Sequence, residues 1–238
     1  MQTFIDTVTN KVYQFEPDVV ATDISGVYSF TTASGIPLTS LPTTLQPYTI
    51  PAPTTAQLAS QAQTAQLTAL SLSYAAAIQT PVSYTSKGGV TKTFQAGSGS
   101  ISNLQNTILG YQAAGTTPSG FYWVSADNTQ VPFTYADLQG LAAVMVAQGW
   151  TAFQHLQTQK AAINTIVNLP ARAAGASYTT GVQIVDGNGN VWSCTTQGTA
   201  GTTCTFPASP TTGTTKTDGG VTWTYINSQV SLIQSIVW

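Results

Sequence analysis

The stretch TYADLQGLAAVMVAQGWTAFQHLQTQKAAINTIVN, residues 134–168, predicts the longest helix of the chain. Thr134 stands at its start as a candidate N-cap, and Asp137 places negative charge in the first turn. The apolar residues recur mostly at steps of three or four, as on one buried helix face. They are Leu138, Leu141, Met145, Ala152, Leu156, Ile163 and Val167. Gly140 and Gly149 weaken the helix, so we expect a kink or a close helix contact near Gly149.

A second long helix is predicted upstream, in TAQLASQAQTAQLTALSLSYAAAIQ, residues 55–79. The segment lacks Gly and Pro, and Thr54 or Thr55 can cap its start. One stripe steps by 4, 3, 4, 3 and 4 residues, the heptad spacing of a close-packed seam. Its members are Leu58, Ala62, Ala65, Ala69, Leu72 and Ala76. Two interpretations stay open: an alanine-rich helix packed inside one subunit, or an oligomer seam between subunits.

Shorter elements are expected between the two helices. Residues 82–94, VSYTSKGGVTKTF, predict a hairpin that turns at Gly88 and Gly89. Residues 98–115 predict another helix, and FYWV, residues 121–124, predicts a strand that a turn separates from the edge segment VPF, residues 131–133. Helices and hairpins therefore alternate in a helix-rich domain over residues 55–170.

The two ends of the chain have a different composition. Residues 1–54 predict an extended or β N-terminal arm with a connector rich in proline, which lacks a backbone donor. Residues 171–226 are turn-rich and β-prone, which predicts a small all-β module after a boundary near residues 170–177. The predicted fold class is α+β: an N-terminal extended or β arm, a helical middle with short hairpins, and a C-terminal β module.

Residues 227–238, NSQVSLIQSIVW, form an apolar end that would be a sticky patch if it were exposed. We expect this tail to dock on its own domain, on a sister subunit or on another protein. The candidate docking residues are Leu232, Ile233, Ile236, Val237 and Trp238.

The composition excludes several classes of protein. Only 6% of residues are charged, while 42% are hydrophobic, so the chain should fold rather than stay disordered. Six scattered cations and a net charge of −2 form no basic stripe, which argues against nucleic acid as a partner. The apolar run LAAVMVA, residues 141–147, is far shorter than the roughly 20 residues that cross a bilayer, so no membrane insertion is expected. No secretory signal peptide is expected either, because an acidic residue, Asp6, comes early and no basic region precedes an apolar stretch.

No motif for catalysis or for cofactor binding is recognisable. The single histidine, His155, has no acidic residue at helical spacing, and no G-x-S-x-G, phosphate-binding loop or Cys/His cluster occurs. DGNGN, residues 186–190, resembles the opening of a calcium loop, but Val191 and Gln197 stand where that loop needs Gly and Glu, so a hairpin turn is favoured. We therefore expect a non-enzymatic protein without a metal or a cofactor.

The two cysteines, Cys194 and Cys204, flank the segment TTQGTAGTT. A disulfide that closes so short a loop would contribute on the order of 2 to 3 kcal/mol. In a reducing cytoplasm both thiols would stay free. Both alternatives remain open.

Three stretches resemble bacteriophage tail proteins. Residues 181–226 resemble a small β module of phage tails, through the motifs GNGNVWSCTTQGTAGTT, FPASPTTGTT and TDGGVTWTYI. Cys204 and the Phe206-Pro207 pair depart from the usual pattern of that module. Residues 121–166 are similar to a tail-protein domain of unknown function that is related to tail-fibre-assembly proteins. The opening TVTNKVYQFEPD is similar to the N-termini of that group.

The resemblance implies a structural component of a phage tail, a fibre or fibre-adaptor protein that acts in virion assembly and host attachment. The alternative is a tail-fibre assembly chaperone that binds the fibre tip, and a third class is a polysaccharide-degrading tail enzyme. The expected partners are other phage tail proteins, further copies of the chain in a homo-oligomer, and a host surface glycan or protein. Neutral amides and hydroxyls beside Tyr and Trp would suit the binding of a glycan. The resemblance also implies that the protein is made in the host cytoplasm and is located in the virion tail.

Overall fold

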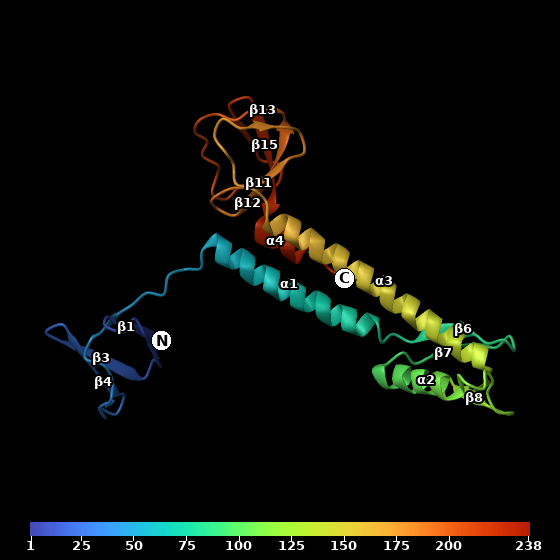
Figure 1. Cartoon of the computed structure of the whole chain (residues 1–238). Helices are drawn as coiled ribbons and strands as arrows, with labels where there is room; N and C mark the ends of the chain where they lie inside the picture. Colours follow the sequence, from blue (N-terminus) through green and yellow to red (C-terminus); the bar gives the residue numbers. More distant parts are fainter. The chain divides into compact units, whose positions relative to one another are not determined.

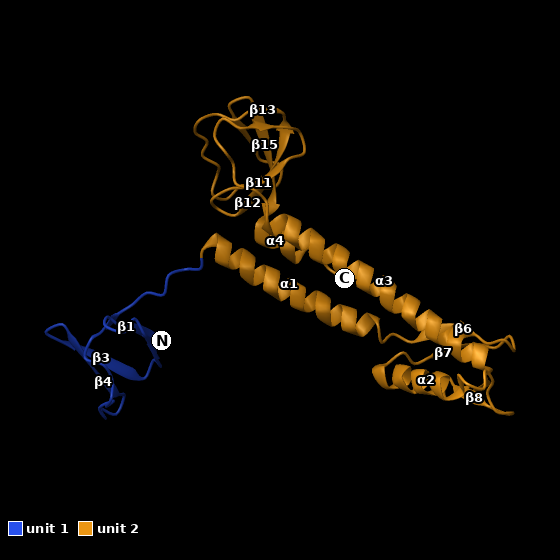
Figure 2. Cartoon of the chain, viewed as in Figure 1, with its two compact units in different colours: residues 1–53 blue, residues 54–238 orange.

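The computed structural model describes all 238 residues, which form two compact units, residues 1–53 and residues 54–238 (Figure 2). Helices and several small antiparallel sheets alternate along the chain, so the predicted α+β class is confirmed (Figure 1). None of the helices combines the length and the apolar character that crossing a membrane requires.

The first unit is built from five short strands. β1 (Gln2–Asp6) lies between β2 (Val12–Phe15) and β5 (Leu45–Pro47) in an antiparallel sheet, and β3 (Val19–Ile24) pairs with β4 (Val27–Thr32) as a hairpin. The side chains of Phe4, Phe15, Phe30 and Leu45 are buried together. The rings of Phe15 and Phe30 stack at a centroid distance of 4.5 Å. The segment that the sequence describes as an arm therefore has a small core of its own.

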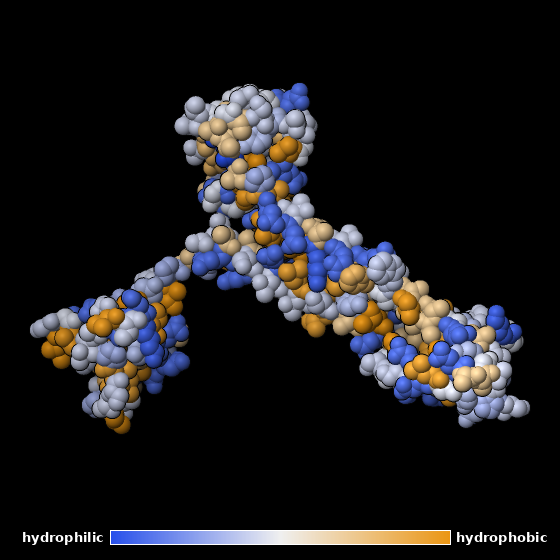
Figure 3. All heavy atoms as spheres, viewed as in Figure 1, coloured by the Kyte–Doolittle hydropathy of each residue, from blue (hydrophilic) through white to orange (hydrophobic).

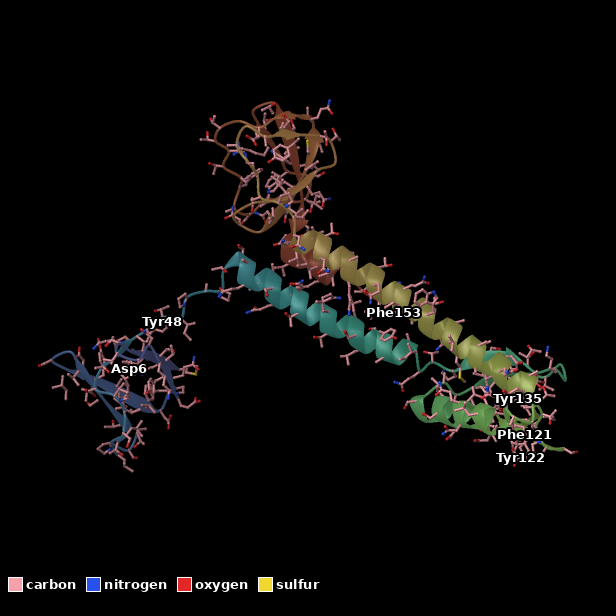
Figure 4. All side chains as sticks on the ribbon, in the orientation of Figure 1. Asp6, Tyr48, Phe121, Tyr122, Tyr135 and Phe153 are labelled. Carbon is pink, nitrogen blue, oxygen red and sulfur yellow. The ribbon has the colours of Figure 1, made fainter.

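Asp6, at the end of β1, ties this unit together across a long stretch of sequence (Figure 4). Its carboxylate accepts hydrogen bonds from the hydroxyls of Thr44 and Thr9 and from the backbone N–H of Val8. The bonds from Thr44 and Thr9 hold the pKa of the carboxyl below its usual value. Asp6 therefore joins the β1–β2 turn to the chain that enters β5.

Two long antiparallel helices dominate the second unit, α1 (Thr55–Ala77) and α3 (Tyr135–Val167) (Figure 1). Each begins with a threonine capping box, in which Thr54 pairs with Gln57 and Thr134 pairs with Asp137. Gln148 of α3 donates to the carbonyl of Ala77 at 2.8 Å, which joins the end of α1 to the middle of α3. The predicted helix limits differ from the observed ones by a residue or two.

The two helices share their core with the short helix α4 (Gln229–Gln234). Ala59, Ala62 and Leu70 of α1 are buried in one cluster with Leu156 and Ile163 of α3 and Ile233 of α4. Gln229, at the start of α4, is itself buried and donates at 2.8 Å to the carbonyl of Ile166. That bond satisfies one of the free carbonyls at the end of α3.

A second cluster lies where α3 begins. It joins α2 (Ser98–Tyr111) to two hairpins, β6 (Val82–Thr85) with β7 (Thr91–Phe94), and β8 (Tyr122–Val124) with β9 (Gln130–Pro132). Phe94, Leu104, Val131, Leu138 and Leu141 are buried in it. The observed hairpins and helix follow the expected order of elements.

The prediction of a kink or a close contact near Gly149 is wrong, because α3 is continuous and a Cβ at Gly149 would meet nothing within 4 Å. The close contact is at Gly140, where a Cβ would clash with the hydroxyl oxygen and the ring of Tyr84. Tyr84 donates to the carboxylate of Asp137 at 3.2 Å. Gly140 therefore makes room for a ring that binds the first turn of the same helix.

The C-terminal module is a four-stranded antiparallel sheet in the order β11 (Gln183–Val185), β12 (Asn190–Thr196), β15 (Val221–Ser228) and β14 (Thr215–Asp218). A small pair, β10 (Ser177–Tyr178) with β13 (Gly198–Thr199), completes it. DGNGN forms the turn between β11 and β12, where the sequence predicts one. The expected limit at residues 226 and 227 is wrong, because β15 continues to Ser228 and runs directly into α4.

Candidate functional site

The predicted oligomer seam on α1 faces mostly outward. Leu58 and Leu72 are 41% and 68% exposed. Ala65, Ala69 and Ala76 are exposed as well, and Ala62 alone is buried. One chain therefore leaves five of the six seam residues uncovered.

The buried face of α1 is a different one. Ala59 and Leu70 are buried against α3 and α4, with Leu67 and Tyr74 packed beside them. Successive residues lie about 100° apart around a helix, so Ala59 points well away from Leu58. The helix thus has two apolar faces, one inside the chain and one at its surface.

The helix α3 also has an apolar face at the surface, which the sequence reasoning missed. Val146 is 71% exposed, Trp150 is 58% exposed and Phe153 is 39% exposed. The rings of Trp150 and Phe153 stack at a centroid distance of 5.8 Å, and Phe153 lies about halfway along the helix (Figure 4). The available signal was three large apolar residues at steps of four and three, outside the predicted buried face.

Figure 3 shows apolar residues at the surface along the helices of the second unit. Val146 borders an apolar cavity of about 230 Å³, which residues of α1, α2 and α3 line. Large exposed apolar faces on a monomer are typical of surfaces that another chain covers. These α1 and α3 faces are the candidate assembly surface.

The structure divides the predicted docking tail between the core and the surface. Ile233 is fully buried, and Ile236 packs against the same cluster. Leu232 is half-buried, Val237 is 63% exposed and Trp238 is 39% exposed. The ring of Trp238 lies edge-on to His155 at a centroid distance of 4.8 Å.

The two cysteines are free thiols in this structure. Cys194 is buried in the core of the module, and burial raises the pKa of its thiol. Cys204 is half-buried, and burial followed by the charge of Asp218 raises its pKa. Neither thiol is therefore shifted toward the reactive thiolate form.

The carboxylates of the module hold its two tryptophans. Asp186 accepts from the indole N–H of Trp192 at 2.9 Å, and Asp218 accepts from that of Trp223 at 3.2 Å. Both indole side chains are 0% exposed. They belong to the core, so they offer no face on which a sugar could stack.

The remaining candidate catalytic or metal-binding side chains lie apart from one another or already form hydrogen bonds. His155 is exposed, and its Nε2 forms a hydrogen bond of 3.4 Å with the side-chain amide of Gln159. Asp137 is buried among the hydroxyls of Thr134 and Tyr84 and the backbone N–H of Lys87. Burial alone would raise the pKa of Asp137, but these hydrogen bonds hold it below its usual value. No group of three His, Cys, Asp or Glu residues is placed where it could hold a metal ion.

Comparison with known proteins gives one match. A family model described as a domain of unknown function (DUF4376) matches residues 56–180, just over half of the 238-residue chain. The matched segment contains α3, α2, the two hairpins and all of α1 except its first residue. No curated protein and no solved structure matches the chain.

Proposed function

The chain belongs to the DUF4376 family, and from this premise we propose that it is a structural component of a bacteriophage tail, a fibre or fibre-adaptor protein. In this role it takes part in virion assembly and in attachment to the host. Its location is the tail of the virion, and it is made in the host cytoplasm. The role is not enzymatic.

The observation that carries the proposal is the apolar surface of α1 and α3. A helix of 33 residues is about 50 Å long. Its C-terminal half packs against the buried face of α1 and against the six-residue α4. Leu58, Leu72 and Trp150 stay at the surface. Apolar faces of this kind favour a role in a permanent assembly, in which further copies of the chain or other tail proteins cover them.

The composition and the sequence resemblances support the same role. Only 6% of the residues are charged, so ionic repulsion between packed copies would be weak. The segment similar to phage tail domains includes nearly all of α3, and the segment similar to the phage tail β module includes β12 and most of β15. In this proposal the chain is a homo-oligomer that also contacts other tail proteins.

Introducing negative charge on α1 tests whether the seam is an interface between copies of the chain. The double variant Leu58→Glu and Leu72→Glu should lower the mass measured by sedimentation equilibrium to that of a monomer, because buried unpaired carboxylates oppose packing. The double variant Ser60→Glu and Ser71→Glu adds the same charge at exposed positions away from the seam and should keep the assembled mass. Equal masses for the two double variants, or a wild-type monomer, would refute the seam.

Purified virions test the role itself. Quantitative mass spectrometry of salt-washed particles should find the chain at a fixed ratio to the other tail proteins. Its absence from washed particles, together with its presence in lysates bound to fibre tips, would replace the structural role by that of an assembly chaperone. A fall in viscosity when the pure chain is incubated with host capsule would instead indicate the polysaccharide-degrading class.

A further inference from the structure

A groove runs between α2 and strand β8 in the helix-rich part of the chain. Two cavities of about 420 Å³ and 680 Å³ adjoin there, because Asn103 and Trp123 line both. Phe121 and Tyr122, which line these cavities, lie near the end where α3 begins (Figure 4). We call this hollow the α2–β8 groove.

The walls of the groove are aromatic rings and side-chain amides. Its main members are Tyr111, Phe121, Trp123, Asn103, Asn106 and Asn128. The three asparagines are exposed, so a ligand can reach their amide groups. An amide both donates and accepts hydrogen bonds, as a sugar hydroxyl does, and an aromatic ring offers an apolar face to the C–H side of a sugar ring.

The absence of charged side chains from the groove indicates the charge of the ligand that it can bind. No charged side chain lines either cavity. The nearby carboxylate of Asp127 is paired with Lys92 at 2.7 Å, and it also accepts from the hydroxyl of Ser125. A phosphate or a carboxylate would therefore find no free cation, so a neutral ligand suits the groove better.

The rings and the turn are held in place before any ligand arrives. The backbone of Trp123 pairs with Val131 of β9, and its side chain packs against the buried cluster at the start of α3. The rings of Tyr111 and Phe121 meet edge-on at 5.6 Å. Asn128 has a φ of 61°, and its backbone N–H bonds to the carbonyl of Ser125 at 3.0 Å. Groups that are already ordered lose little entropy when they bind a ligand.

We propose that the α2–β8 groove binds a neutral saccharide, with Trp123 as the stacking platform and Asn103 as the central hydrogen-bonding group. The host surface as the source of that saccharide rests on the proposed role in host attachment. The binding chemistry rests on the groove alone. The neutral amides beside Tyr and Trp that the sequence offers to a glycan are here assigned to the family domain.

The test is affinity electrophoresis of the whole chain in gels that contain dextran, mannan, galactan or β-glucan, followed by an array of neutral bacterial oligosaccharides. At least one neutral saccharide should retard or capture the wild type, while polygalacturonate, a charged polysaccharide, should not. Trp123→Ala and Asn103→Leu should each weaken that binding at least tenfold. Trp123 is partly buried, so Trp123→Ala can disturb folding. Asn103 is exposed on α2, so Asn103→Leu tests binding without that complication. Asn188→Leu replaces an exposed asparagine in the turn between β11 and β12, outside the groove, and should bind like the wild type.

Three results would overturn the inference: no neutral saccharide bound, retention by polygalacturonate alone, or unchanged binding in Asn103→Leu. Mass spectrometry of washed virions distinguishes a failure of this inference from a failure of the proposed function. If the chain is present in virions but binds no saccharide, the structural role stands and the proposal for the groove fails. If the chain binds saccharide through Asn103 but is absent from virions, the proposal for the groove stands and the structural role fails.

Discussion

The guanidinium of Arg172 holds the carboxylate of Asp218 with two hydrogen bonds, Nε to Oδ2 at 2.7 Å and Nη2 to Oδ1 at 2.8 Å. The Asp218 side chain is 0% exposed. It also accepts from the backbone N–H of Gly201 and from the indole of Trp223. One carboxylate thus joins the segment that follows α3 to the loop at Gly201 and to strand β15.

Removing the cation should destabilise this module strongly. Arg172→Met leaves a buried carboxylate without its charge partner, which should lower the free energy of unfolding by about 3 kcal/mol. Urea unfolding followed by tryptophan fluorescence measures the change. The control is Lys92→Met, which breaks the exposed pair with Asp127 and should shift the midpoint far less. Equal shifts in the two variants would contradict the assignment.

Acid should act on the same carboxylate. The hydrogen bond from Arg172 lowers the pKa of Asp218 below the ordinary value of 3.8. The stability that this shift contributes is therefore complete above the ordinary value and is lost as the pH falls through the lower folded value. Melting temperatures measured from pH 6 down to pH 2 should fall more steeply below about pH 4 in the wild type than in Arg172→Met. Parallel curves would show that Asp218 is not the group responsible.

Two glycines of α3 should respond in opposite directions to alanine. Gly149→Ala meets empty space and should stabilise the helix by up to about 1 kcal/mol. Gly140→Ala places a methyl group against the ring of Tyr84, displaces its hydrogen bond to Asp137, and should destabilise by about 1 to 2 kcal/mol. Thermal unfolding of both variants decides the matter, and a change of the same sign in both would count against the contact.

The C-terminal tail offers a matched pair of core and surface positions. Ile233→Ala opens a cavity among α1, α3 and α4 and should cost about 3 kcal/mol. Val237→Ala removes a side chain that is 63% exposed and should change the unfolding midpoint little. A large effect at Val237 in the isolated chain, with none at Ile233, would mean that α4 does not dock as described.

Local patterns were sufficient to predict the three longer helices and the two hairpins between α1 and α3, but they did not predict α4. The caps at Thr54 and Thr134 follow from the sequence, because a threonine followed three residues later by Gln or Asp satisfies the free N–H groups locally. The role of Gly140 was not predictable. Its partner Tyr84 is far away in the sequence, and a glycine in a helix looks the same whether or not a ring crosses it.

The candidate surfaces were predictable in part. The heptad stripe on α1 is visible in the sequence, but the same helix has a second apolar series through Ala59 and Leu70. Which series the chain buries depends on where α3 and α4 lie. The α2–β8 groove had no local signal, because Asn103 and Trp123 come from elements separated by a long loop.

The amino-acid sequence by itself determined the α+β class, the order of the elements and the near-absence of charge, because these depend on composition and on short-range periodicity. The choice of buried face on α1, the pairing of Arg172 with Asp218 and the assembly of the groove came only with the packed chain. Each of them joins residues that are distant along the chain. Packing geometry, and not local propensity, settles which of several apolar or polar partners meet.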